Sequence, residues 1–139
     1  MDMVRAVLKA LIFTLCTAVT LLLVASAIAL AAPDPDAVSG MLGVATIIIS
    51  SLAGGIAAAR IDIERPLSVA IPTVAVYLLL HMAVRLILGD GQGSFISILI
   101  TYIGAVAAAV LGALIARPHR SKGSKGVRRF KKYSKKMRA

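Results

Sequence analysis

Residues 94–116 read SFISILITYIGAVAAAVLGALIA, and residues 117–139, which follow at once, read RPHRSKGSKGVRRFKKYSKKMRA. The first stretch contains no charged side chain and is about as long as the ~20 apolar residues that a helix needs to cross a bilayer. The second stretch carries eleven Lys or Arg and no acidic residue. This abrupt change of composition predicts a membrane-spanning helix that ends at a polybasic tail.

Three further apolar stretches precede this one, at about 10–32, 38–59 and 67–88. Hydrophobic residues make up 59% of the 139-residue chain, more than the roughly half that is usual in soluble proteins. A soluble globule would carry such stretches as an aggregating apolar coat, whereas a helix in lipid satisfies its own backbone hydrogen bonds. We therefore predict an all-α integral membrane protein. Residues 1–116 would form a four-helix antiparallel transmembrane bundle, and residues 117–139 a disordered or conditionally helical cytoplasmic tail.

The basic residues lie almost entirely on one side of the predicted spans. Fifteen of the sixteen Lys and Arg precede the first span, lie in the second connection or follow the last span, and only Arg85 lies near the opposite side. The positive-inside rule then places both the N- and the C-terminus in the cytoplasm. The sequence also suggests an alternative start, because residues 27–32 resemble the cleavage site of a signal peptide. The preceding apolar run is longer than a signal core and Pro33 follows it, so we expect this segment to be retained.

Proline, aspartate and serine residues mark the expected helix starts. Asp34 is placed to cap the second helix with Pro35 in its first turn, Pro66 opens the third helix, and Ser94 is placed to cap the fourth. The connections are short, which favours packing of consecutive helices against each other.

Small residues recur every four positions on the second and fourth spans and indicate helix packing faces. Because lipid removes most of the hydrophobic drive between helices, close backbone approach at small residues must hold them together. We therefore predict that these two spans pack tightly, within one chain or between copies in a homo- or hetero-oligomer. The predicted packing residues are Thr46, Ser50, Gly54, Ala58, Gly104, Ala108 and Gly112.

The third span alone carries a polar face. Thr73, Tyr77, His81 and Arg85 are spaced four apart and so share one side of the helix, and Pro72 precedes them. One interpretation is structural, with His81 hydrogen-bonded to a hydroxyl such as those of Tyr77, Thr101 or Tyr102. The other is a polar cavity or transport path, because ionisable groups at membrane depth are costly. No second His, Cys or carboxylate lies at the depth of His81, so the sequence predicts no metal, cofactor or catalytic site.

The tail is the second candidate binding site. Its cations could contact the anionic inner leaflet, or grip ribosomal RNA while two aromatic rings stack on bases; we expect no DNA binding. The residues concerned are Arg128, Arg129, Phe130, Lys131, Lys132, Tyr133, Lys135, Lys136 and Arg138.

The segment Gly54-Gly55-Ile56-Ala57-Ala58-Ala59-Arg60, followed by a short charged loop and a third span with Tyr77, resembles the YrzE-like family of small four-span membrane proteins. The resemblance extends over residues 1–116 and implies the plasma membrane of a Gram-positive bacterium and no known enzymatic activity. This chain departs from the family pattern at Pro72 and in its long basic tail.

The expected function is accordingly that of a non-enzymatic accessory or scaffold protein, surrounded by membrane lipids, whose tail binds anionic lipid or ribosomal RNA. The alternative is a small transporter or channel subunit that uses the polar face of the third span. An insertase-like factor is a third hypothesis, and it requires Arg85 in a hydrophilic groove open to the cytoplasm.

Overall fold

The computed structural model describes residues 2–88 and 94–117, and these residues form four helices without a strand among them. The helices are α1 (Met3–Ala31), α2 (Pro35–Ile61), α3 (Pro66–Leu88) and α4 (Phe95–Ile115). Each is long and apolar enough to cross a membrane. The all-helical fold and the four candidate membrane spans are thus as predicted, and they support a multi-pass membrane protein.

The helix starts follow the local sequence, with one exception. Asp34 caps α2, because its side chain accepts a hydrogen bond from the backbone N–H of Ala37 at 3.3 Å and Pro35 opens the first turn. Pro66 begins α3, after Asp62 has accepted hydrogen bonds from two backbone N–H groups of the preceding turn. Ser94 occupies the N-cap position of α4 as predicted, but its side chain makes no capping hydrogen bond there.

Helix α1 begins earlier than the apolar pattern predicts, at residue 3 rather than about residue 10. Its first turns include Arg5 and Lys9, which are good helix formers, and Arg5 lies 3.7 Å from the Asp2 carboxylate on the exposed surface. At ~1.5 Å per residue, the helix is longer than the ~30 Å hydrocarbon core. The extra turns therefore carry the charged residues beyond the apolar part of the helix.

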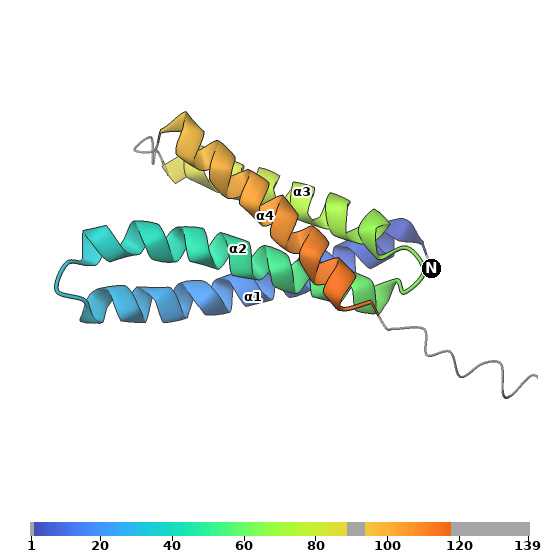
Figure 1. Ribbon diagram of the computed structural model, residues 1–139. Helices are drawn as coiled ribbons and strands as arrows, with labels where there is room; N and C mark the ends of the chain where they lie inside the picture. The colour runs from blue at the N-terminus through green and yellow to red at the C-terminus, as the bar shows by residue number, and fades with distance from the viewer. Residues whose placement is uncertain (1, 89–93, 118–139) are drawn as a thin grey trace, which may run out of the picture.

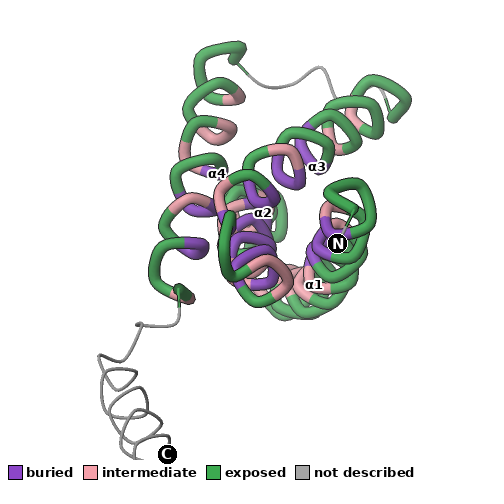
Figure 2. Tube along the Cα trace, turned by 90° about the vertical axis from the view of Figure 1, so that its right-hand side faces the viewer, coloured by how far each residue is buried: buried purple, intermediate pink, exposed green. Residues whose placement is uncertain are grey.

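The four helices converge at one end and separate at the other (Figure 1). The N-terminus, the connection between α2 and α3 and the end of α4 lie together at the closed end. At the far end, the α3–α4 pair tilts away from the α1–α2 pair. Helix α2 is central and contacts α1, α3 and α4, which makes it the element on which the rest is assembled (Figure 2).

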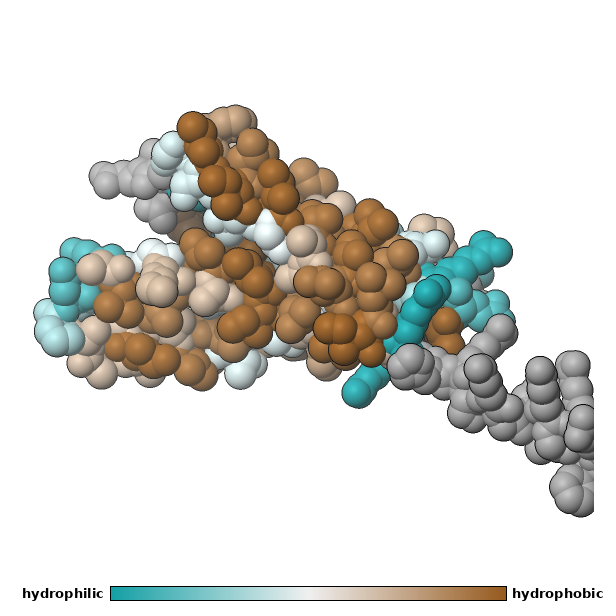
Figure 3. Space-filling view, viewed as in Figure 1, coloured by the Kyte–Doolittle hydropathy of each residue, from teal (hydrophilic) through white to brown (hydrophobic). Residues whose placement is uncertain are grey.

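The buried residues lie mainly in the half of each helix that is nearer the closed end. The buried side chains are mainly small, and two clusters of them form the core, one of which joins Ala10, Ala58, Ala70 and Ala113 near the closed end. The outer faces are instead covered with large apolar side chains such as Leu23 (69% exposed) (Figure 3). An apolar exterior around a core of small residues is typical of helices solvated by lipid.

Candidate functional site

Close helix contacts lie along α2, where two glycines of α2 and one of α4 occupy positions at which a larger side chain would not fit. A Cβ at Gly55 would fall on the backbone carbonyl of Ala109 in α4, and one at Gly112 on the carbonyl of Leu52 in α2. On another side of α2, a Cβ at Gly54 would strike the hydroxyl of Thr14 in α1. The backbone of α2 thus contacts the backbone of α4 on one side and the Thr14 side chain of α1 on another, at the same level of the helix.

Six of the seven predicted packing residues are buried, and Gly54 and Gly112 among them make the contacts just described. Those buried in the structure are Thr46, Ser50, Gly54, Ala58, Ala108 and Gly112. Gly104 differs, because it is only half-buried and an added Cβ would make an ordinary 3.8 Å contact with Ile48. The tightest of these contacts is at Gly55, which with Ser51 forms a second row of small residues parallel to the row that contains Gly54.

Helix α1 packs through a row that the sequence analysis missed. Its buried residues are Ala6, Ala10, Thr14 and Ala18, again spaced four apart. The spacing of small residues that marks this row is visible in the sequence. The hydroxyl of Thr14 donates to the Ala10 carbonyl at 2.8 Å, so this polar group is satisfied within its own helix.

The polar face of α3 divides into a packed part and an open part. Thr73 is buried and donates to the Val69 carbonyl at 2.7 Å. Tyr77 is also buried, and its hydroxyl lies 2.8 Å from the hydroxyl of Ser50. Because Ser50 donates to the Thr46 carbonyl, Tyr77 is the donor to Ser50. This pair joins α3 to α2 inside the core, so half of the predicted face is structural.

His81 and Arg85 lie nearer the open end, where both line a cavity. His81 Nδ1 lies 3.1 Å from the hydroxyl of Tyr102, and the two rings meet edge to face with centroids 6.0 Å apart. The Tyr102 hydroxyl also lies 3.7 Å from the sulfur of Met82. His81 therefore joins α3 to α4 through Tyr102, which is one of the three hydroxyl partners that the sequence suggested.

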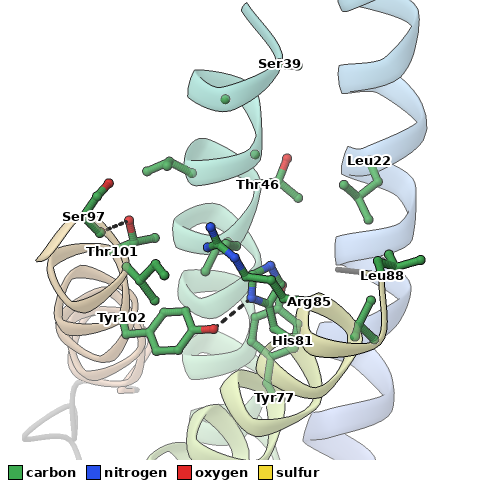
Figure 4. A pocket seen from close by; sticks show the side chains of 16 residues that line it. Leu22, Ser39, Thr46, Tyr77, His81, Arg85, Leu88, Ser97, Thr101 and Tyr102 are labelled. Carbon is green, nitrogen blue, oxygen red and sulfur yellow. Dashed lines mark hydrogen bonds between the residues drawn. The ribbon is translucent and has the colours of Figure 1, made fainter. Parts of the chain in front are cut away.

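The cavity has a volume of about 550 Å³ and lies between α2 and the α3–α4 pair, with one residue of α1 on its wall (Figure 4). Along α3 its lining extends from Leu88 at the helix end to Tyr77. The surface is visibly hollowed between the two pairs of helices at this end (Figure 3). The volume lies within the ~300–1,000 Å³ of typical ligand pockets. The polar lining residues are Ser39, Thr46, Tyr77, His81, Arg85, Ser97, Thr101 and Tyr102.

The chemistry available in this cavity is that of binding. Its polar side chains supply hydroxyl groups, one imidazole and one guanidinium, whereas its described lining residues include no carboxylate or thiol. Across residues 2–88 and 94–117, no three His, Cys, Asp or Glu side chains are grouped so as to hold a metal ion. Cys16 is exposed on α1. Hydrogen-bonding and charge recognition are therefore what the arrangement offers.

The predicted tail site lies wholly outside the described residues, as does the rest of the tail apart from Arg117. The whole set of aromatic and basic tail residues, from Arg128 to Arg138, thus remains a prediction from the sequence.

Comparison with known proteins gives no relative for this chain: no family model, no curated protein and no solved structure matches it. The likeness to YrzE-like proteins accordingly stays an interpretation of the sequence.

Proposed function

We propose that this chain is a non-enzymatic accessory or scaffold protein of the bacterial plasma membrane, an antiparallel four-helix bundle with both termini in the cytoplasm. The observation that carries the proposal is the close packing of α2, whose backbone contacts the backbone of α4 at Gly55 and Gly112 and the Thr14 side chain of α1 at Gly54. Close contacts at small residues hold the helices in fixed positions, which favours a scaffold over a protein whose helices must move relative to one another. The excess of Lys and Arg before the first span, in the second connection and after the last span supports the orientation.

In this proposal the tail is the part that engages a partner. Eleven cations attract anionic lipid headgroups or ribosomal RNA, and the lipid surface adjoining the last span supplies about 1 kcal/mol per basic residue. An oligomer would have to form through surfaces other than the rows around Gly55 and Gly112, because those rows are occupied within the chain.

Ribosome binding tests the tail's role. We expect the full chain in nanodiscs of neutral lipid to co-sediment with ribosomes at physiological salt, and a truncation after Ala116 to stay in the supernatant. Neutral lipid is chosen so that the tail is not drawn to the disc surface. Pelleting should weaken steeply with added salt, since phosphate contacts release counterions. Equal sedimentation of the two forms would contradict ribosome binding by the tail, and would leave anionic lipid as the tail's partner.

A small transporter or channel subunit is the second candidate, and the cavity beside His81 and Arg85 is the observation in its favour. Against it, the lining reaches no deeper along α3 than Tyr77, where the bond to Ser50 ties α3 to α2. Solute flux in proteoliposomes that exceeds empty liposomes, and that His81→Ala abolishes, would establish this candidate. Flux no greater than that of empty liposomes would remove it.

An insertase-like role fits less well. It requires the groove around Arg85 to open toward the cytoplasm, whereas the cavity lies at the end away from the N-terminus and Arg117 (Figure 1). In the proposed orientation that end faces the opposite side of the membrane.

A further inference from the structure

The inner part of the cavity lies deep in the proposed membrane span. Along α3 it extends from His81 to Tyr77, and His81 lies seven residues before the helix end at Leu88. At ~1.5 Å per residue this is about 10 Å along the helix axis, so His81 of a spanning helix lies in the hydrocarbon layer. A charged ligand is costly at this depth, which favours an uncharged one.

The hydroxyl groups around this inner part have already used their hydrogens. Thr46 and Thr101 each donate to the carbonyl four residues earlier in their own helix, at 2.8 and 2.9 Å. Tyr77 donates to Ser50 of α2, and the hydroxyl of Tyr102 lies within reach of two acceptors in α3. What these oxygens offer a ligand is therefore their lone pairs, which accept hydrogen bonds.

His81 has one ring nitrogen left for a ligand. Its Nδ1 is engaged with the Tyr102 hydroxyl at 3.1 Å (Figure 4), and within the described part of the chain no group bonds Nε2. If Tyr102 donates to Nδ1, Nε2 carries the hydrogen of the neutral ring; if Tyr102 donates to the Met82 sulfur, Nε2 is an acceptor. A ligand hydroxyl both donates and accepts, so it fits Nε2 in either tautomer as well as the lone pairs nearby.

Apolar side chains from all four helices form much of the remaining lining. They include Leu22, Ile47, Val84 and Ile98. The cavity volume of about 550 Å³ suits a small ligand, whose apolar part would be removed from competing solvent against these side chains. The outer faces of the same helices are also apolar, so an apolar molecule can reach the cavity from the bilayer itself (Figure 3).

From this combination we infer that the cavity between α2 and the α3–α4 pair binds an uncharged alcohol dissolved in the membrane, a mainly apolar molecule with one hydroxyl group. The ligand hydroxyl bonds Nε2 of His81, and the apolar part lies against walls such as Ile47 and Ile98. The contacts with His81 lie deeper than Arg85 and do not depend on it. This site is separate from the tail and goes beyond the accessory role proposed above.

The test uses the full chain in nanodiscs that contain a photoreactive octanol with a diazirine on its chain or, in parallel, the methyl ether of that probe. The ether has the same apolar part but no hydrogen to donate. Cross-linked peptides are identified by mass spectrometry, and labelling of the exposed face of α1 around Leu23 measures how much probe the bilayer holds. Relative to that face, cavity positions on α2 and α4 should take up about fivefold more alcohol than ether, the effect of one net hydrogen bond.

The variant His81→Phe keeps an aromatic ring and removes both nitrogens. It should lower cavity labelling by the alcohol about fivefold and leave labelling by the ether unchanged. The ether is the control for folding, because a bundle that had lost its packing would lose labelling by both probes. Displacement of the probe by dioleoylglycerol would assign a lipid alcohol as the occupant, and displacement by unlabelled octanol alone a small solute; both support the inference.

Three results would overturn the inference. Labels confined to the outer faces of the helices would show that the cavity takes up no alcohol. Equal relative labelling of the wild-type cavity by the alcohol and the ether would show that a hydroxyl group is not selected, and this comparison needs no variant to fold. Alcohol labelling in His81→Phe equal to wild type would show that the imidazole does not bind the ligand. None of these results bears on ribosome sedimentation, so the two proposals fail separately.

Discussion

Replacing Gly55 with alanine is expected to lower the free energy of unfolding by about 2–3 kcal/mol, the upper part of the range for overpacked interiors. The new methyl group would fall on the backbone carbonyl of Ala109. A backbone atom cannot rotate aside as a side chain can, so α2 and α4 must move apart over several turns. Unfolding driven by SDS in mixed micelles, followed by helical circular dichroism, measures the change.

The same helix supplies the control for this substitution. Gly43 also lies within α2, and an added Cβ there meets nothing within 4 Å. Gly43→Ala should therefore change the free energy of unfolding by no more than about 1 kcal/mol, in the stabilising direction, since Ala favours the helix. Equal effects of the two substitutions would mean that α2 and α4 are not in backbone contact at Gly55.

At Gly54 the obstacle is a side chain, and a second substitution should therefore relieve it. The methyl group of Gly54→Ala would strike the hydroxyl of Thr14, at a cost of about 1–3 kcal/mol. Thr14→Ala removes that hydroxyl and its methyl group, leaving only an ordinary 3.4 Å contact with the Thr14 Cβ position. The double variant should thus be more stable than the sum of the single effects predicts, by about 1–2 kcal/mol.

A second double-mutant cycle, at Gly55 and Ala109, serves as the control. It tests whether relief requires removal of the atom that the new methyl group would strike, or follows from any loss of a methyl group nearby. Ala109→Gly removes only a methyl group and leaves the carbonyl that Gly55→Ala would meet, so it should give no relief. Additive effects in the Gly54–Thr14 cycle, or relief of equal size in the Gly55–Ala109 cycle, would contradict the packing described for α1, α2 and α4.

The sequence predicted the local features of the fold, the helices and their caps, better than it predicted the contacts between helices. The four apolar stretches and the cap at Asp34 depend on nearby residues, and the helices and their bounds followed from them within a few residues, apart from the start of α1. The short connections predicted that consecutive helices pack together, and α1 does contact α2; the face of α1 that makes the contact did not follow. Small residues four apart show that a helix face is suitable for packing, but they do not say which neighbour occupies it.

The site shows the same division. The spacing of Thr73, Tyr77, His81 and Arg85 placed them on one face, as a period of four requires. It could not show that Tyr77 is bound to Ser50 in the core while Arg85 lines a cavity, because that difference arises from the tilt of α3 and α4 away from α2. Helix tilt depends on contacts distant in the sequence, such as those of Gly55 and Gly112, and no local pattern records it.

The central claim is that the membrane-spanning bundle is tightly packed at its cytoplasmic end and encloses a cavity at the other end. The most direct test compares the accessibility of cysteines introduced on two faces of α4. Thr101 lines the cavity, whereas Ile103, two residues further on, is 62% exposed on the outer apolar face. In a Cys16→Ala background, a membrane-impermeant maleimide applied from the side away from the termini should label Thr101→Cys much faster than Ile103→Cys. Equal labelling of the two positions, or labelling of Thr101→Cys only from the cytoplasmic side, would contradict the account.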